Sequence, residues 1–146
     1  MAISSGAALY EYGTQVTAIS DTSAIADTAF NAGTITALVQ TDCCPLGDAV
    51  LNVTMAVAPA AGAAFHLYRR DMNIDGTNDS TAPDANFKST YIGSFPLDLV
   101  TSAQYISLTD IPLTVDQEFY LENDAGQATS GTTVLKVTPK SYNAKA

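Results

Sequence analysis

Residues 51 to 57 read Leu51-Asn52-Val53-Thr54-Met55-Ala56-Val57. Apolar side chains fall at every second position from Leu51 onward, and the polar Asn52 and Thr54 lie between them. Successive side chains of an extended chain point to opposite sides, so the apolar residues share one face. The pattern predicts a half-buried β-strand.

Similar alternation, less strict, recurs along the chain, whereas helical periodicity is nearly absent. Gly, Pro, Asn and Asp separate the alternating segments, as is typical of turns. The pattern predicts about eight strands, the number expected for an antiparallel β-sandwich that is jelly-roll-like. The expected strands are residues 15–19, 34–39, 51–57, 65–68, 91–97, 105–108, 118–122 and 133–137.

Turn residues predict three chain reversals, at residues 45–48, 59–62 and 123–126. The first two contain both Pro and Gly, and the third contains Gly after Asn-Asp-Ala, which favours tight turns. Pro96 and Pro112 cannot donate a ladder hydrogen bond, so we expect them at strand ends or on edge strands.

The chain has 146 residues, room for one domain with a single core. Residues 1–13 are uncharged except for Glu11 and predict an N-terminal arm, disordered alone or ordered against a neighbouring subunit. Residues 14–146 form the predicted β-sandwich domain. Residues 21–31 fit either a short helix or a long loop.

The composition is 47% apolar and only 14% charged, with a net charge of −9. Such an acidic surface repels phosphate, which argues against nucleic-acid binding and against attachment to anionic lipid. The first residues lack the basic start and apolar core of a secretory signal, and no apolar run reaches about 18 residues. We therefore expect synthesis and folding in the cytosol, with no membrane partner.

The segment from Asp71 to Asp79 is a polar loop between two predicted strands. Its alternate oxygen-bearing side chains, with Gly76 at the sixth position, have the spacing of a calcium loop. Ala82 stands where such a loop has a bidentate Glu, and Asn, Asp and Gly also cluster in loops that bind no metal. Both interpretations stay open, and no other cofactor is predicted. The candidate calcium ligands are Asp71, Asn73, Asp75 and Asp79.

No catalytic constellation is visible in the sequence. Cys43 and Cys44 are adjacent, which disfavours a disulfide, and with His66 they still lack a fourth spaced metal ligand. We expect small buried or half-buried thiols there. Lone His66 should face away from the core without an activated nucleophile. Glu118 and Glu122 would lie roughly 13 Å apart on one strand, too far for a glycosidase pair.

Arg69-Arg70 follows a predicted strand directly and precedes the acidic loop. The two side chains either neutralise Asp71, Asp75 or Asp79 or contact another subunit. Tyrosine combines contact area with a polar tip, which favours interfaces. The tyrosines expected near strand ends or on exposed strand faces are Tyr10, Tyr12, Tyr91, Tyr105, Tyr120 and Tyr142.

The order of segments between residues 65 and 142 resembles that of small tailed-phage virion proteins of the β-sandwich type, which decorate or cement the capsid. The resemblance covers about half of the chain and rests on patterns. Its segments are Phe65-His66-Leu67-Tyr68, the loop 71–79, Tyr91-Ile92-Gly93-Ser94-Phe95-Pro96-Leu97, residues 119–128 and Val134-Leu135-Lys136-Val137-Thr138-Pro139.

The resemblance implies a non-catalytic protein that binds the major capsid protein on the outside of a virion assembled in the bacterial cytoplasm. It also implies a homo-oligomer, most often a trimer, with a dimer as the other possibility. Two other classes compete with this interpretation. A carbohydrate-binding or host-adhesion module would use the exposed tyrosines and the loop 71–79, and a small hydrolase would need a nucleophile motif that the sequence lacks.

Overall fold

The computed structural model describes residues 10–41, 44–88 and 90–142. These residues form ten strands, and none of them is helical, which confirms the predicted all-β class. No helix in this part of the chain could therefore span a membrane. The strands are β1 (Tyr10–Tyr12), β2 (Val16–Asp21), β3 (Thr34–Ile35), β4 (Leu38–Val39), β5 (Leu46–Val53), β6 (Ala64–Asp71), β7 (Tyr91–Pro96), β8 (Gln104–Pro112), β9 (Asp116–Asp124) and β10 (Thr133–Tyr142).

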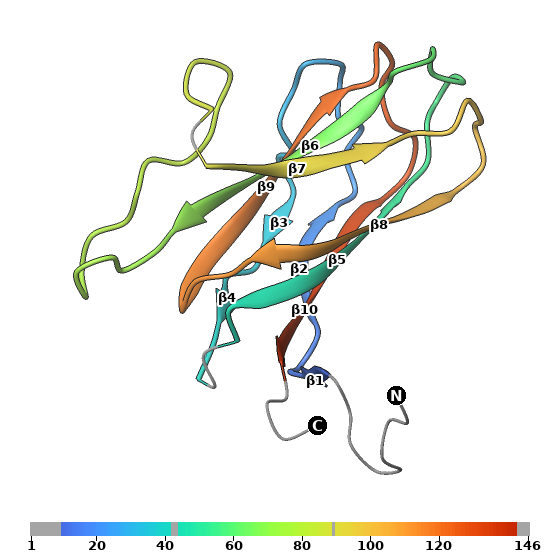
Figure 1. Cartoon of the computed structure of the whole chain (residues 1–146). Helices are drawn as coiled ribbons and strands as arrows, with labels where there is room; N and C mark the ends of the chain where they lie inside the picture. The colour runs from blue at the N-terminus through green and yellow to red at the C-terminus, as the bar shows by residue number, and fades with distance from the viewer. Residues whose placement is uncertain (1–9, 42–43, 89, 143–146) are drawn as a thin grey trace, which may run out of the picture.

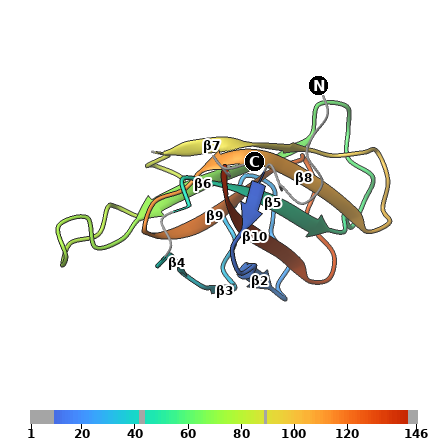
Figure 2. The same ribbon diagram turned by 60° about the horizontal axis from the view of Figure 1, so that its bottom comes forward.

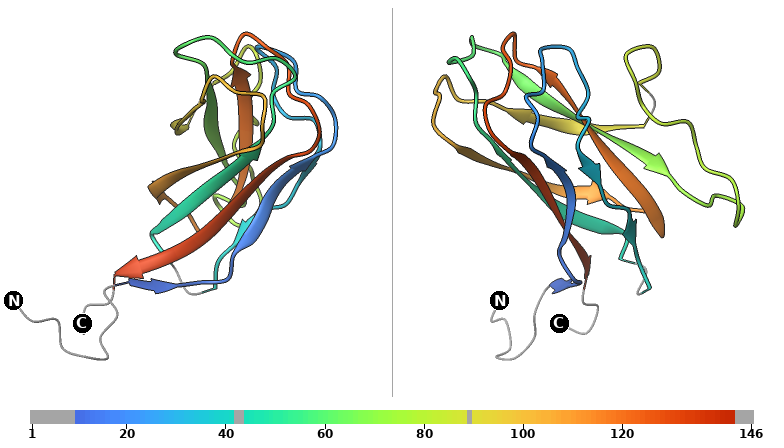
Figure 3. Two further views of the ribbon diagram at one scale, coloured as in Figure 1. Left: turned by 90° about the vertical axis from the view of Figure 1, so that its right-hand side faces the viewer. Right: turned by 180° about the vertical axis from the view of Figure 1, so that it is seen from behind.

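The strands make two antiparallel sheets that pack face to face (Figure 1 and Figure 3). One sheet has the order β3-β2-β10-β5-β8, with β1 also on β10, and the other has the order β4-β9-β6-β7. From β4 onward, every connection crosses between the sheets except β6–β7. Two four-stranded layers in the orders β2-β10-β5-β8 and β4-β9-β6-β7 define a jelly roll, so this prediction is confirmed.

One hydrophobic core fills the space between the sheets. The inward side chains of β5, β6, β9 and β10 alternate with outward ones, most of which are polar, as the sequence pattern predicts. Among the core residues, Leu51, Phe65, Phe119, Leu121 and Leu135 are fully buried.

The reversal predicted at residues 45–48 is wrong, because Leu46 to Asp48 belong to β5. Gly47 pairs with Pro139 and Ile111, and a Cβ at Gly47 would lie 2.8 Å from a methyl group of Leu113. Glycine is needed there for close packing and not for a turn.

The other two reversals are confirmed, with left-handed φ angles of 89° at Gly62 and 71° at Gly126. Pro96 and Pro112 end the edge strands β7 and β8, as predicted. These two edges meet along one side of the sandwich (Figure 2), where an added Cβ at Gly93 would lie 2.7 Å from Leu108.

Residues 21–31 contain no helix: Asp21 ends β2 and residues 22–31 form a loop, which decides the alternative that the sequence left open. Phe30 makes a β-bridge to Glu122 at the edge of β9. The single strand predicted for residues 34–39 is divided instead: β3 joins the six-stranded sheet and β4 the four-stranded sheet. The chain passes from one sheet to the other between β3 and β4. An alternation pattern predicts a strand but not the sheet to which it belongs.

The described part of the predicted arm lies on its own chain. Residues Tyr10 to Tyr12 pair with Lys140 to Tyr142 of β10, and the Lys140 ammonium lies 5.0 Å from the centre of the Tyr10 ring. Residues 10–12 are thus ordered on their own chain, which differs from both expectations for the arm, disorder or ordering by a neighbouring subunit. The rest of the predicted arm, residues 1–9, lies outside the described residues.

Candidate functional site

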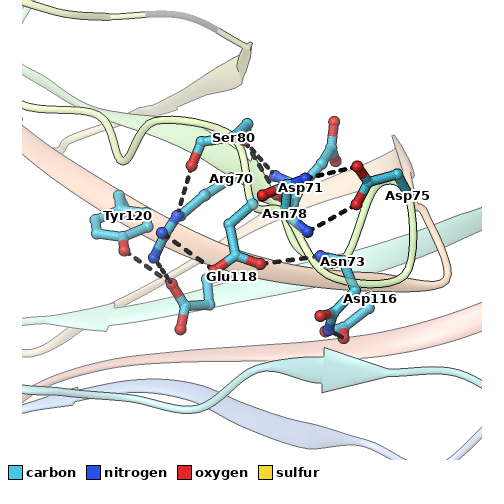
Figure 4. Close-up of polar contacts among 10 residues, drawn as sticks. Arg70, Asp71, Asn73, Asp75, Asn78, Ser80, Asp116, Glu118 and Tyr120 are labelled. Carbon is cyan, nitrogen blue, oxygen red and sulfur yellow. Dashed lines mark hydrogen bonds and ion pairs between the residues drawn. The ribbon is translucent and has the colours of Figure 1, made fainter.

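The loop 71–79 begins at the end of β6. Its polar side chains form hydrogen bonds and ion pairs with one another and with residues of the neighbouring strands (Figure 4). Asp75 accepts hydrogen bonds from the backbone N–H groups of Thr77 and Asn78 and from the Asn78 side-chain amide at 2.6 Å. These bonds, first those from Asn78, lower the pKa of Asp75 to about 2. The carboxylate thus stabilises the turn around Gly76 locally.

The other three candidate ligands point to different partners. Asn73 donates its side-chain amide to Asp116 at 2.6 Å, while Asp79 accepts the backbone N–H of Asn73. Asp71 forms an ion pair with Arg69, with its carboxylate oxygen 2.8 Å from Arg69 Nε. Within the described ranges, no three or more His, Cys, Asp or Glu side chains are grouped to hold a metal. Calcium binding by these side chains stays a prediction, and it requires them to exchange their present partners.

Arg69 and Arg70 neutralise the loop, which was one of the two interpretations. Arg69 pairs with Asp71, and Arg70 lies 3.4 Å from Asp79 and 3.2 Å from Glu118. The Nε–H of Arg70 also donates to the carbonyl oxygen of Ser80 at 2.8 Å. Asp75, the third predicted partner, has no ion pair in the described part of the chain.

His66 lies on the outer face of the four-stranded sheet, opposite to the core, as predicted. Its Nδ1 is 2.7 Å from Ser94 Oγ and its Nε2 is 3.1 Å from Asp124. The Ser94 hydroxyl also lies 2.6 Å from the Tyr91 hydroxyl. Ser94, His66 and Asp124 are the residue types of a nucleophilic triad. Catalysis by a triad also requires hydrogen-bond donors positioned to stabilise the oxyanion of the reaction intermediate. The expectation of no catalysis remains a prediction.

A second polar group lies beside this row. Glu122, only 4% exposed, accepts from the Tyr68 hydroxyl at 2.9 Å and pairs with Lys88. Burial, and then the hydrogen bond to Glu122, raises the pKa of Tyr68 to about 12. The two groups border a hollow of about 360 Å³, which His66 and Asp124 also line. Glu118 binds Arg70 separately, so the two glutamates do not act as a pair.

Sequence reasoning did not identify Ser94, Lys88, Asp116 and Asp124 as partners of the predicted residues. Ser94 and His66 are register partners of β7 and β6, separated by 28 positions in sequence. Alternation places a side chain on a face, but strand register decides which side chains meet there, and alternation does not specify register.

Cys44 is buried and its thiol is free, as predicted, while Cys43 lies outside the described residues. The backbone N–H of Cys44 donates to the side chain of Gln40, and Gln40 donates in return to the Cys44 carbonyl oxygen. This pair of bonds holds the chain where β4 leads into β5.

Exposed apolar side chains occur on β1, on β4, in the loops that follow β6 and β8, and at the end of β10. Figure 1 shows these segments along one end of the sandwich. Val39 lines two adjoining hollows there, one with Gly13 and Pro139 and the other with Ile74 and Val115. We call this region the strand-end surface. Its exposed members are Tyr12 (61%), Val39 (63%), Ile74 (66%), Val115 (58%) and Tyr142 (63%).

The tyrosine prediction is confirmed for four exposed residues and in part for two others. Tyr10 and Tyr120 are half-buried. The Tyr120 hydroxyl donates a hydrogen bond to Glu118. The four exposed tyrosines are Tyr12, Tyr91, Tyr105 and Tyr142.

The fold and these surfaces define an all-β jelly roll with an apolar end and a polar outer sheet face. Comparisons with protein families, with curated proteins and with solved structures found no match.

Proposed function

We propose that the protein is a structural component of a phage virion that binds the assembled capsid from outside and stabilises it without catalysis. The partner is the major capsid protein. The observation that carries this proposal is the strand-end surface, because five exposed large apolar side chains at one end favour a protein partner. The jelly roll occurs in viral capsid proteins and supports the proposal by analogy of fold.

The proposed mechanism is mass action. A protein that binds only the assembled lattice stabilises that lattice by its binding free energy. Val39 stands at the centre of the strand-end surface, since it lines both hollows. A partner side chain seated in either hollow removes Val39 from water, along with Ile74 and Val115 on one side, and burial of each aliphatic side chain contributes roughly 1.5–3 kcal/mol.

Cosedimentation with undecorated capsids of its own phage tests this proposal. The variants Val39→Asp and Val115→Asp each place a charge in the surface and should weaken binding about tenfold or more. Val57→Asp is the control, because Val57 is 55% exposed and lines neither hollow. Absence of wild-type protein from the capsid pellet, or equal loss in all three variants, would overturn the proposal.

A second candidate function is a carbohydrate-binding or host-adhesion module. The hollow beside Glu122 favours it, since His66, Lys88 and Asp124 line the hollow with donors and acceptors. The centre of the Tyr91 ring lies 6.1 Å from that of His66, and Tyr91 is 55% exposed. Sugars are bound by such combinations of polar groups and aromatic faces. A glycan array with and without chelator separates the candidates: a selective glycan signal without capsid binding establishes the adhesion module.

A further inference from the structure

A β-bulge turns Tyr91 toward the outer face of the four-stranded sheet. The register of β6 and β7 shifts by one residue between Leu67 and Tyr68, and Tyr91 is the partner of Tyr68. With regular alternation from Ser94, the Tyr91 side chain would point to the core. The extra residue in β7 reverses its direction, as bulges do beside functional sites. The centre of the Tyr91 ring consequently lies 6.1 Å from that of His66 and 5.7 Å from that of Tyr68.

A chain of hydrogen bonds runs from Tyr91 to Asp124 along this face. The hydroxyl groups of Tyr91 and Ser94 lie 2.6 Å apart, and Ser94 Oγ lies 2.7 Å from His66 Nδ1. His66 Nε2 lies 3.1 Å from one oxygen of Asp124. The other oxygen of Asp124 forms no hydrogen bond or ion pair with the described residues, and the side chain is 62% exposed. Asp124 therefore presents an oriented and free acceptor to the hollow that it lines.

A second chain of contacts ends at Lys88. The Tyr68 hydroxyl donates to Glu122 at 2.9 Å, and the other Glu122 oxygen pairs with the Lys88 ammonium. Glu122 is 4% exposed, whereas the Lys88 side chain is 46% exposed. An ammonium has three donors, and Glu122 is its one partner among the described residues. Lys88 therefore presents free donors to the same hollow, and a buried carboxylate holds them in place.

Two threonines beside the hollow have strained backbones. Thr28, which lines the hollow, has a φ of 61°, and Thr90, which precedes Tyr91, has a φ of 55°. The left-handed region is unfavourable for β-branched residues. The backbone N–H of Thr28 donates to the Asn123 carbonyl oxygen at 2.7 Å, which keeps Thr28 against β9. Strain of this kind is concentrated at binding and active sites, so it supports a ligand in this hollow.

Side chains of both charge signs line the hollow, and this limits the ligand. Glu122 and Asp124 repel an anionic group, and Lys88 repels a cationic one. A hydroxyl group accepts from an ammonium and donates to a carboxylate, so a ligand with neighbouring hydroxyl groups satisfies both. The volume of about 360 Å³ lies at the low end of ligand sites and suits a single ring.

We propose that this hollow binds one neutral sugar ring at the end of a glycan, with neighbouring hydroxyl groups bonded to Lys88 and Asp124. A C–H face of the ring packs on Tyr91. Glu122 acts through Lys88 and is a positioning residue. The inference rests on the second candidate function and names its ligand class: neutral sugars bind, whereas sugars with a carboxylate or an ammonium group are rejected.

Saturation-transfer NMR and isothermal titration calorimetry on the full-length chain at pH 7 test the ligand class. The neutral probes are the methyl glycosides of glucose, galactose and mannose, and the charged probes are glucuronic acid and glucosamine. We expect at least one neutral probe to bind with a Kd near about 1 mM, because a single ring offers few contact atoms. Both charged probes should bind at least about tenfold more weakly.

Matched variants locate the site. Tyr91→Ala and Asp124→Ala should each weaken binding of the neutral probe at least about fivefold, because the first removes the ring face and the second removes the acceptor. Tyr105→Ala and Asp98→Ala are the controls, since Tyr105 is 72% exposed on the other sheet and Asp98 is exposed in the loop after β7. Circular dichroism verifies folding, and if Asp124→Ala is unfolded, Tyr91→Ala decides.

Glu122→Gln tests the charge argument. The variant retains an acceptor for the Tyr68 hydroxyl and loses one negative charge. The neutral probe should bind about threefold more weakly, because Lys88 is no longer held, while glucuronic acid should bind more tightly. A purely structural role of Glu122 would weaken both probes.

The inference is wrong if a charged probe binds as tightly as the neutral ones, or if Tyr91→Ala and Tyr105→Ala have equal effects. The second candidate function would then stand with another ligand class or another site. Absence of binding by every neutral probe also contradicts the inference. An empty glycan array in addition would remove the second candidate function itself.

Discussion

Asp75 illustrates at the residue scale how one side chain can fit two functions. Its spacing from Asp71 and Asp79 is that of a calcium ligand, yet its carboxylate is engaged by Thr77 and Asn78 within four positions of the chain. Asp in a loop commonly bonds its own following backbone. Spacing alone therefore does not separate an ion site from a turn.

The ionisation of Asp75 yields a prediction about pH. Its pKa is lowered from 3.8 to about 2, so its stabilisation of the turn is present above about pH 3.8 and is lost as pH falls toward 2. We expect an NMR titration of the Asp75 carboxyl carbon to have its midpoint near 2. Asn78→Ala keeps the backbone N–H bond and removes only the side-chain amide bond, so the midpoint should rise part of the way toward 3.8. An unchanged midpoint would show that the Asn78 side chain does not contribute to the shift.

Calcium binding by the loop is tested by thermal melts with calcium and with chelator. If Asp71, Asn73, Asp75 and Asp79 bind the ion, calcium at 100 times its Kd should add about 2.7 kcal/mol to the free energy of unfolding. The double variant Asp75→Asn with Asp79→Asn should abolish that response. If the wild-type midpoint is the same with calcium and with chelator, the loop only connects strands.

Lys140 yields a prediction about stability. Hydrogen bonds to Asp110 and then Asp48 raise its pKa above 10.5, so its contribution is present below pH 10.5 and is lost as pH rises through the folded-state value. We expect Lys140→Met to lower the free energy of unfolding at pH 7 by about 1–3 kcal/mol. Urea denaturation measures it, with the exposed Lys136→Met as control, which should change stability by under about 0.5 kcal/mol.

At the scale of single elements, packing determines where the strands lie. Gly33 precedes β3, and a Cβ there would lie 2.4 Å from the Cα of Asp21 and 2.6 Å from the Ser20 carbonyl oxygen. This close approach allows the loop after β2 to return and pair β3 with β2. The Asp21 carboxylate stabilises the same loop, because it accepts hydrogen bonds from the backbone N–H groups of Ser23 and Ala32.

Gly33→Ala should therefore destabilise the fold by about 3 kcal/mol or more, because the added carbon meets backbone atoms that cannot rotate away. Gly76→Ala is the comparison: its φ is +91° and nothing lies within 4 Å of an added Cβ. We expect that change to cost about 1–2 kcal/mol through backbone strain alone. Chemical denaturation of both variants checks the order, and an equal effect at the two positions would contradict it.

At the scale of the whole molecule, β10 connects the fold. It pairs with β1, β2 and β5, so the first and last strands of the described residues belong to one sheet. Its inward residues Leu135 and Val137 are fully buried. In contrast, β1 contributes three residues at the rim, and no residue of β1 belongs to the hydrophobic core.

Two truncations of the chain should therefore behave differently. Deleting residues 2–12 removes β1 and should leave a cooperatively melting jelly roll that binds capsids less well. Deleting residues 133–146 removes the partner of three strands, exposes the core and should abolish the cooperative melt. Calorimetry compares the two proteins. If the second deletion still gave a cooperatively melting protein, β10 would be dispensable for folding and the prediction would be wrong.

The sequence by itself determined the all-β class, the approximate number of strands and the outward position of His66. Alternation in β5, β6 and β9 is a local property, and burying one face of each strand leaves few other folds open. The pairing of Arg69 and Arg70 with the loop was also within reach, since the partners are close in sequence.

The tertiary structure alone decided which outward side chains meet. Register placed Ser94 and Asp124 beside His66, and Tyr105 beside Asn52. It also divided residues 34–39 between two sheets and turned Gly47 from an expected turn into a packing position. These features depend on contacts between strands far apart in the chain, and the period of two in a strand carries no information about such partners.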